Sequence, residues 1–257
     1  ASSFTDTADH RSHLALAYNQ YQFTAADPAY RPELEALQML LRPLLLTSFL
    51  LDDFLHEHHY FSAEQIILTS ASSKTALGLA FMLNHQRSVR AGKPQRIVAL
   101  TSAANAKFVS GLGYYDQTIA YDQLDEIDAS KPSVLIDFAG NGTLLAEVHQ
   151  RLEGNLKFSS LVGAAHWDQR KGEKNLPGAK PEVFFAPGYW AQRNKELGAT
   201  ELIGRFARLW APLAQSVGSW MEIKTAQGVE AMMQAYTDTL NGLIKPETGM
   251  IMRTHSK

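Results

Sequence analysis

The chain has 257 residues, of which 45% are hydrophobic and 19% are charged, and its formal net charge is −2. This composition is typical of a globular protein rather than a disordered one, and the balanced charge argues against a nucleic-acid partner. The chain contains no cysteine, which excludes a disulfide scaffold, a thiol nucleophile and a thiolate metal site. Because cysteine-free chains suit the cytoplasm, we expect a cytoplasmic location.

The first 60 residues predict an irregular start followed by helices. Residues 1–30 are polar and show no regular pattern. Leucines then recur at helical spacing from Arg31 onward, and Pro43 predicts a kink or a break, with a second helix over Leu45 to His56. The apolar run Met39 to Leu55 is interrupted by charged residues and is shorter than the roughly 20 residues of a membrane span. We therefore expect a buried helix and no membrane partner.

From about Phe61 onward, short apolar runs alternate with helical patterns. Near-continuous apolar strands separated by helices indicate a parallel sheet that is covered on both faces. We predict a Rossmann-like three-layer α/β domain over residues 61–257, preceded by an α-helical segment over residues 1–60. The predicted strands are Gln65–Thr69, Arg96–Thr101, Thr118–Ala120, Ser133–Phe138 and Lys157–Val162. The predicted helices are Lys74–Asn84, Asn105–Leu112, Leu144–Leu152, Thr200–Ala214 and Gln227–Leu240, with a polar loop over His166–Lys180.

The turn after the first predicted strand stands where a dinucleotide-binding fold has its glycine-rich turn. Ser70, Ser72 and Thr75 occupy the three glycine spacings, with Ser73 and Lys74 between them. Hydroxyl groups can donate to a phosphate, whereas Cβ atoms limit how closely the backbone can approach it. Phosphate binding and an inert strand-to-helix turn therefore both remain open. A nucleoside-triphosphatase loop is rejected because both of its glycines are replaced.

The end of the second predicted strand favours one form of the cofactor. NAD-binding folds place an acidic residue there to hold the ribose hydroxyls. This chain instead has Thr101, Ser102 and Asn105, followed by Lys107, which suit a 2′-phosphate better. We therefore favour NADP (NADPH) over NAD. The alternative is that Ser102 simply caps the helix that follows.

Several strings of the sequence resemble an uncharacterised family, the domain of unknown function 2855. The run of serines before Lys74 and Thr75 is the most specific of them, and the resemblance covers nearly the whole chain. This family is similar to zinc-free medium-chain dehydrogenases/reductases of the quinone or enoyl reductase type. The strings are Tyr18-Asn19-Gln20-Tyr21, Leu40-Leu41-Arg42-Pro43-Leu44, Thr47-Ser48-Phe49-Leu50, Ser70-Ala71-Ser72-Ser73-Lys74-Thr75-Ala76, Leu100-Thr101-Ser102 and Val162-Gly163-Ala164-Ala165-His166-Trp167.

The resemblance implies a Rossmann domain joined to a GroES-like substrate domain. It also implies that most of the GroES-like half would precede residue 1 and is missing from this chain. The turn after the first strand would face the pyrophosphate, and the end of the second strand would face the 2′-phosphate, with Tyr121 near the adenosine. The fourth and fifth strands would end on the nicotinamide side. The residues so assigned to the cofactor are Ser70, Ser72, Ser73, Lys74, Thr75, Thr101, Ser102, Asn105, Tyr121, Gly140 and Gly163.

Other residues suggest chemistry but also have structural interpretations. His166 follows the fifth strand and could donate a proton to a substrate, or could be hydrogen-bonded within a packed loop. The histidines of His56-Glu57-His58-His59 do not share one helix face, so we expect a polar helix end and no metal site. The aromatic cluster Phe184–Trp190 is compatible with a ligand pocket, a subunit contact or a core.

The leading hypothesis is an NADP(H)-dependent oxidoreductase that acts on a small carbonyl, enone or quinone compound. A competing hypothesis is a non-enzymatic Rossmann-like module that has lost its cofactor and forms a homo-oligomer through the sheet edge or the segment Thr248–Arg253. A second alternative is a serine hydrolase-like enzyme, with a serine of the Ser70–Ser73 turn and with Asp137 and His166 as its partners.

Overall fold

The computed structural model describes residues 2–27, 30–90, 96–162 and 175–254. The chain forms two compact units. The terminal unit combines Ala1–Pro43, Ala186–Leu243 and Thr248–Lys257, and the sheet unit combines Leu44–Phe185 with the four residues Ile244–Glu247. The sequence predicted one boundary near residue 60. The contacts instead divide the chain after Pro43 and again after Phe185, so both ends of the chain contribute to the terminal unit.

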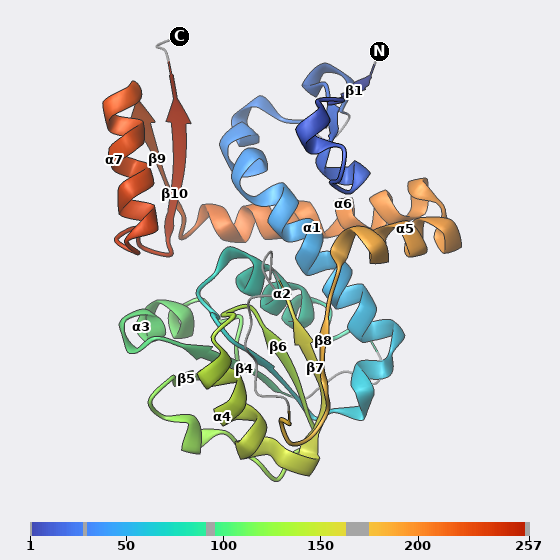
Figure 1. Cartoon of the computed structure of the whole chain (residues 1–257), viewed down its shortest axis with the longest axis vertical. Coiled ribbons are helices and arrows are strands. Elements are labelled where there is room, and N and C mark those ends of the chain that lie inside the picture. Colours follow the sequence, from blue (N-terminus) through green and yellow to red (C-terminus); the bar gives the residue numbers. More distant parts are fainter. Residues whose placement is uncertain (1, 28–29, 91–95, 163–174, 255–257) are drawn as a thin grey trace. The chain divides into compact units, whose positions relative to one another are not determined.

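The sheet unit is built on six parallel strands (Figure 1). Their order is β5-β4-β3-β6-β7-β8, so the first of these strands lies inside the sheet and the chain adds two strands on one side before it crosses to the other. Doubly wound dinucleotide-binding folds have this order, which confirms the predicted Rossmann-like parallel sheet. The strands are β3 (Gln65–Leu68), β4 (Arg96–Thr101), β5 (Gln117–Ala120), β6 (Ser133–Asp137), β7 (Leu156–Leu161) and β8 (Pro181–Val183).

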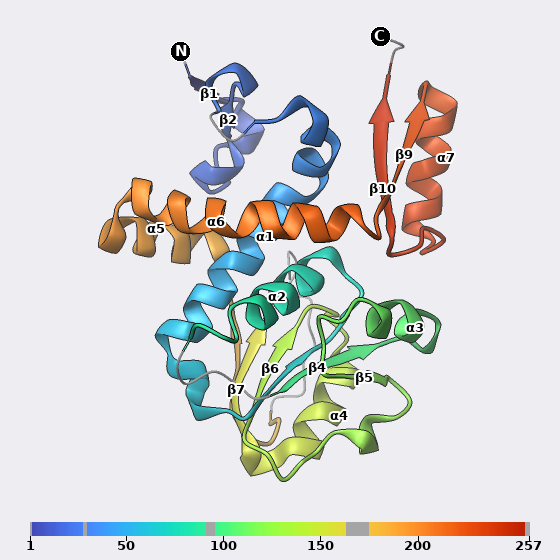
Figure 2. The same ribbon diagram turned by 180° about the vertical axis from the view of Figure 1, so that it is seen from behind.

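Helices cover both faces of this sheet, because side chains alternate between the faces along each strand. Ile67 and Leu135 belong to a buried cluster with leucines of α4 (Gly142–Leu152). Ala99 faces the other way and packs against Val109 of α3 (Ala103–Gly111). Figure 2, seen from behind, shows α2 (Lys74–His85) on the face opposite α4. The result is the three-layer arrangement that the apolar strands predicted.

Helix α1 (Glu35–Glu57) runs without interruption past Pro43, so the predicted break into two helices is wrong. A proline inside a helix costs about 3 kcal/mol through a lost hydrogen bond and a steric clash. Buried apolar side chains on both sides of the proline, including Leu41 and Leu45, offset this cost. Of the described helices, α1 with its preceding turn (Pro32–Glu57) is long and apolar enough to span a membrane.

A carboxylate on the buried part of α1 is held by residues that follow α2. Asp52 is fully buried, and its Oδ2 lies 2.8 Å from the guanidinium of Arg90 and accepts a hydrogen bond of 2.6 Å from Gln86. Burial raises the pKa of Asp52 to about 6, although Arg90 opposes that rise. This ion pair joins α1 to the segment that follows α2 inside the sheet unit.

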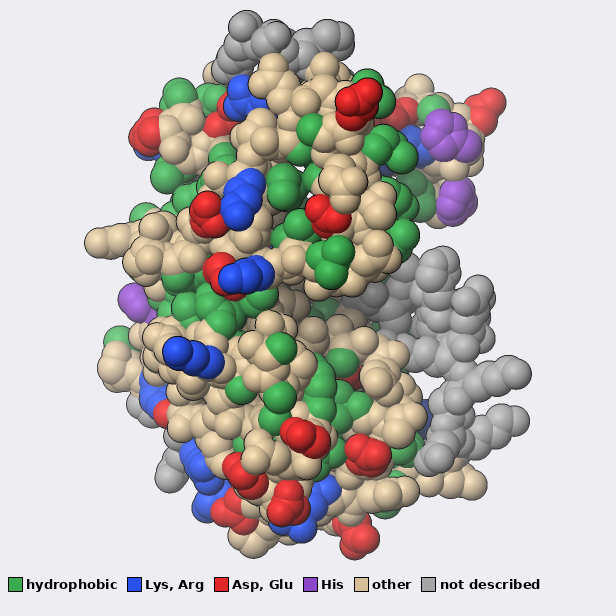
Figure 3. Space-filling view, turned by 90° about the vertical axis from the view of Figure 1, so that its left-hand side faces the viewer, with side chains coloured by type: hydrophobic (Ala, Val, Ile, Leu, Met, Phe, Trp, Pro, Cys, Tyr) green, Lys and Arg blue, Asp and Glu red, His purple; other side chains and the backbone are tan. Residues whose placement is uncertain are grey.

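The remaining elements build the terminal unit. Ser3–Thr5 and Gln20–Gln22 pair as antiparallel strands, and the last two strands pair in parallel. An apolar stripe on α7, formed by Val229, Met233, Tyr236 and Leu240, is 58–72% exposed, and Figure 3 shows apolar side chains on this surface. The elements are β1 (Ser3–Thr5), β2 (Gln20–Gln22), α5 (Ala186–Leu197), α6 (Ala199–Gly218), β9 (Glu222–Gln227), α7 (Val229–Leu240) and β10 (Thr248–Arg253).

Gly78 allows α1 and α2 to pack closely in the sheet unit. A Cβ atom at this position would lie 2.4 Å from Leu45 Cδ2 and 2.7 Å from Ser48 Oγ. Ser48 is fully buried and donates a hydrogen bond of 2.7 Å to the carbonyl of Thr75, which lies in the first turn of α2. The hydrogen bond from Ser48 therefore holds the start of α2 against α1.

We expect Gly78→Ala to destabilise the protein by about 1–3 kcal/mol, because the new methyl group overpacks the contact with α1. Urea unfolding monitored by circular dichroism measures the change. Gly111→Ala is the matched control, since nothing lies within 4 Å of a Cβ at that helical glycine. Equal stability of the two variants would contradict the close packing.

A buried histidine makes stability depend on pH. His149 is fully buried, with Nδ1 2.9 Å from the carbonyl of Pro177 and Nε2 2.9 Å from Ser159 Oγ. Because a carbonyl only accepts, Nδ1–H donates to Pro177, and in the neutral ring Nε2 accepts from the Ser159 hydroxyl. Burial lowers the pKa of His149 from its ordinary value of 6.5.

The neutral ring thus contributes stability that is fully present above pH 6.5 and is lost as the pH falls below that value. We expect the stability advantage of the wild type over His149→Gln to shrink between pH 7 and pH 5, measured by urea unfolding at each pH. His10→Gln, at an exposed position, is the control. A difference that does not change with pH would contradict the neutral buried ring.

Candidate functional site

The order of strands in the sheet reverses between β3 and β6. The two strands are neighbours in the sheet, and the chain leaves them in opposite directions. In open α/β sheets this reversal creates a crevice at the carboxyl ends of the strands, and ligands bind there. The segments that follow β3, β4 and β6 meet at this edge, and they carry most of the site residues that the sequence predicted.

The turn after β3 adopts a conformation that normally requires glycine. Ser70 has φ of +46°, in the left-handed region, and its carbonyl accepts a hydrogen bond of 2.8 Å from the N–H of Ser73. Ser73 is the N-cap of α2, and its hydroxyl accepts from the N–H of Ala76 at 3.3 Å. The turn therefore has a serine, and not a glycine, in the left-handed conformation.

Side chains from neighbouring elements hold this turn in place. The N–H of Ser70 donates to the Tyr121 hydroxyl at 3.0 Å, and Asn105 Nδ2 donates to Ser72 Oγ at 3.1 Å. The hydroxyl of Tyr115 donates to the carbonyl of Ala71 at 2.9 Å. Burial raises the pKa of Tyr121, so its hydroxyl stays protonated at neutral pH. The structure thus brings Tyr121 and Asn105 directly to the turn.

The start of α2 presents backbone donors and one cation. In the described ranges, no oxygen accepts from the N–H groups of Ser72, Lys74 and Thr75. The Lys74 side chain is half-buried, and burial lowers the pKa of its ammonium group. Its Nζ donates to the carbonyl of Pro246 at 3.2 Å. Unpaired N–H groups at a helix N-terminus, next to a cation, form an arrangement suited to an anion.

The ends of β3 and β6 are tied together by a buried carboxylate. The Thr69 hydroxyl donates to Asp137 Oδ1 at 2.6 Å and accepts from the N–H groups of Phe138 and Ala139 at 2.9 and 3.1 Å. Asp137 Oδ2 accepts from the N–H of Gly140 at 3.3 Å. Gly140 is exposed and has φ of +66°, so glycine is favoured there by the turn itself.

The end of β4 carries the predicted hydroxyl and amide groups without an acidic residue. Thr101 is buried, and its carbonyl accepts from the N–H of Tyr121 at 2.9 Å. Ser102 is the N-cap of α3, but its hydroxyl makes no capping hydrogen bond. The interpretation of Ser102 as a simple side-chain cap is therefore not supported.

Two of the predicted site residues, Gly163 and His166, lie outside the described residues. The histidine-rich end of α1 continues into four residues, His59 to Ser62, whose φ values of 49–56° are all left-handed. In this turn Phe61 stacks on Phe158 with ring centroids 4.1 Å apart. Among the described residues, no group of three acidic or histidine side chains could hold a metal ion.

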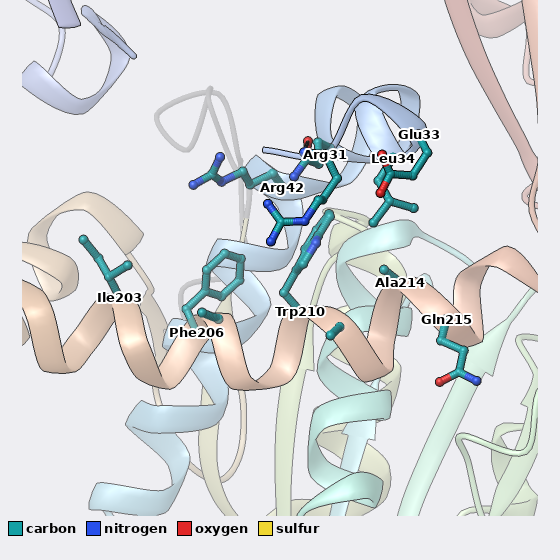
Figure 4. A pocket seen from close by; sticks show the side chains of 12 residues that line it. Arg31, Glu33, Leu34, Arg42, Ile203, Phe206, Trp210, Ala214 and Gln215 are labelled. Atoms are coloured by element: carbon teal, nitrogen blue, oxygen red, sulfur yellow. Dashed lines mark hydrogen bonds between the residues drawn. The ribbon is translucent and has the colours of Figure 1, made fainter. Parts of the chain in front are cut away.

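A second hollow lies in the terminal unit and was not predicted. It has a volume of about 690 Å³ and is mainly apolar, with Phe206 and Trp210 of α6 on one side (Figure 4). Arg31 and Arg42 line another side, and Arg42 pairs with Asp27. The predicted aromatic cluster Phe184–Trp190 does not line this hollow. The aromatic residues of the hollow come instead from α6. The helical spacing of apolar residues does not distinguish a helix face in the core from one that lines a pocket.

The chain belongs to the family described as "Protein of unknown function (DUF2855)", whose model matches residues 1–245. No curated protein matches the sequence. Among solved structures, an alcohol dehydrogenase from Thermotoga maritima is similar, with 10% identity, a TM-score of 0.58, and coverage of 91% of this chain and 60% of that chain. A candidate NADPH:quinone reductase from Mesorhizobium loti has 12% identity, a TM-score of 0.57 and coverage of 93% and 64%.

CurA from Vibrio vulnificus in complex with NADPH has 14% identity, a TM-score of 0.48 and coverage of 80% and 63%. The chain thus spans 60–64% of the length of these three structures. At these identities the likeness shows the fold alone, which is similar to that of the alcohol dehydrogenase and of the quinone reductase.

We expect Tyr121→Phe to destabilise the protein by about 1–2 kcal/mol, because it leaves the half-buried N–H of Ser70 without an acceptor. Thermal and urea unfolding measure the loss. Tyr236→Phe is the control, since that side chain is 58% exposed. Identical unfolding curves for wild type and Tyr121→Phe would rule out a role of the phenol in holding the turn.

Proposed function

We propose that this member of the DUF2855 family binds NADP(H) where β3, β4 and β6 end, and works as an oxidoreductase of the medium-chain reductase type. The observation that carries the proposal is the set of N–H groups at Ser72, Lys74 and Thr75 that find no acceptor in the described part of the chain, located at the reversal of the strand order. In dinucleotide-binding folds the pyrophosphate is held at this position of the first strand-to-helix turn.

The residues present fit a dinucleotide in chemical terms. The N–H groups and the ammonium of Lys74 would bind the pyrophosphate as donors. Ser102 and Asn105 would lie at the adenosine ribose, since the end of the second strand in chain order reads that sugar. Gly140 would let the backbone after β6 approach the nicotinamide half closely. The bound cofactor would supply hydride transfer, whereas the protein binds and orients the reactants and excludes water.

The choice of NADP(H) over NAD(H) rests on the charge at the end of β4. The ribose hydroxyls of NAD are usually held by a carboxylate at this position. Thr101 to Asn105 contain no acidic residue, and the Ser102 hydroxyl is not used by its own helix. A 2′-phosphate would therefore meet donors rather than a repelling charge. The substrate we propose is a small carbonyl, enone or quinone compound, and His166 is the proposed proton donor.

One observation favours a different function, a Rossmann-like binding or assembly module without a cofactor. No glycine remains at the three fingerprint positions, and the N–H groups of Ser70 and Ala71 are used by Tyr121 and by the carbonyl of Leu100. Such a module would keep the fold and show no affinity for either dinucleotide. The binding experiment below separates the two proposals.

Calorimetric titration with NADPH and, separately, with NADH tests the proposal. We expect binding of NADPH and weaker binding of NADH. Ser102→Glu should weaken NADPH binding at least about tenfold through repulsion of the 2′-phosphate, and should weaken NADH binding less. Ser110→Glu, at an exposed position on the same helix, is the matched control. If neither NADPH nor NADH gives a heat of binding, the result would support the cofactor-free module instead.

A further inference from the structure

Four residues near the C-terminus belong to the sheet unit, although the residues on both sides of them belong to the terminal unit. Ile244–Glu247 is assigned with Leu44–Phe185, whereas Ala186–Leu243 and Thr248–Lys257 are not. Ile244, Pro246 and Glu247 are half-buried, and Lys245 is exposed. We call Ile244–Glu247 the strap. It returns to the sheet unit at one particular place, the start of α2.

The strap is joined to the turn after β3 through Lys74. The Lys74 ammonium donates to the carbonyl of Pro246 at 3.2 Å, across 172 positions of sequence. Glu247 lies near enough to raise the pKa of Lys74, which burial lowers more strongly. An ammonium group has three N–H donors, and the described residues supply this one with a single acceptor. Two of its donors thus have no acceptor among the described residues.

We infer that the strap closes over the pyrophosphate of the bound dinucleotide, and that Lys74 is the positioning residue that couples the two by bridging the Pro246 carbonyl and a phosphate oxygen. This inference rests on the proposed function. The geometry needs no exchange of partners, because one ammonium can donate to both oxygens at once. Bound phosphate then orders the strap, and an ordered strap slows release of the dinucleotide.

The same contact supplies a charge that the turn itself lacks. A glycine-rich turn brings several backbone donors close to the phosphates, whereas Cβ atoms at Ser70, Ser72 and Thr75 limit that approach. A lysine can reach a phosphate from farther away and acts on it as a point charge. Lys74 would therefore take over part of the binding that the missing glycines provide in other dinucleotide-binding folds.

Hydrogen exchange measured by mass spectrometry on the full chain tests the strap. The probes are NADPH and inorganic pyrophosphate, each at saturation, and the readout is exchange in peptides that cover residues 243–249. We expect either probe to slow exchange several-fold in the wild type. Faster or unchanged exchange with a probe that binds would overturn the inference.

Variants of Lys74 separate coupling from a structural role. Lys74→Met should weaken NADPH binding about tenfold to hundredfold, the worth of a charge-assisted hydrogen bond, and should abolish the protection of the strap. Lys74→Arg should restore most of both effects. Lys245→Met, an exposed lysine of the strap itself, should behave as the wild type. If Lys74→Met does not fold, the test is the comparison of Lys74→Arg with the wild type. Equal NADPH affinity and equal protection of the strap from exchange in these two proteins would support the inference.

The outcomes distinguish the inference from the proposed function. NADPH binding by the wild type with equal affinity in Lys74→Met, and no change in the strap, would overturn the inference and leave the function standing. Pyrophosphate binding with strap protection, but no binding of either dinucleotide, would support the strap as a phosphate clamp and overturn the dinucleotide function. No binding of any probe would overturn both.

Discussion

The hydrogen bond from Thr69 to Asp137 joins the two strands between which the sheet reverses its direction of growth. Both residues are buried, and the donor and acceptor oxygens are 2.6 Å apart. The carboxylate of Asp137 also accepts hydrogen bonds from backbone N–H groups after β6. A buried carboxylate is stable only when its oxygens are satisfied by donors. The backbone after β6 must therefore turn around Asp137, and the turn after β3 begins at the residue that supplies one of those donors. The position of both segments at the sheet edge follows from this one group.

The turn after β3 has no glycine at the three fingerprint positions, so side chains must stabilise its conformation. A left-handed residue other than glycine costs roughly 1–2 kcal/mol, and Ser70 has that conformation. The turn makes hydrogen bonds with Tyr121, Asn105 and Tyr115. Each contributes about 0.5–1.5 kcal/mol, so together they offset the conformational cost. These side chains come from the ends of β5, from α3 and from the loop after α3. The conformation of the turn thus depends on side chains from neighbouring elements, whereas glycine adopts a positive φ without such support.

The sequence predicted the part of the fold that rests on local patterns. Apolar strands and helices over residues 65–162 were found close to their true bounds because each is a separate run with clear punctuation. The continuity of α1 through Pro43 was missed because a local rule for proline carries no information on buried neighbours such as Leu41 and Leu45. Strands β8 and β9 were missed because they are short or mostly exposed, and so lack an apolar pattern. Strand β10 was missed although its first half is buried.

The candidate site was predicted as a set of residues but not as a network. Spacing located Ser70, Ser72 and Thr75, and the missing acid after β4 is visible in the sequence itself. That Tyr121 accepts from Ser70, and that Lys74 contacts Pro246, depends on segments 51 and 172 positions away. No pattern in a single sequence reports such contacts, because they follow from the strand order and from the return of a distant segment.

The charge at Lys74 gives the strongest physical reason to expect an anionic ligand. Within the described part of the chain its ammonium contacts a neutral carbonyl, and Glu247, whose charge raises the pKa of Lys74, makes no ion pair with it within 4.0 Å. A half-buried cation without a close counter-charge loses hydration that one carbonyl does not replace, which is why burial lowers its pKa. An anion bound at the start of α2 would restore that balance and would also satisfy the three unpaired N–H groups.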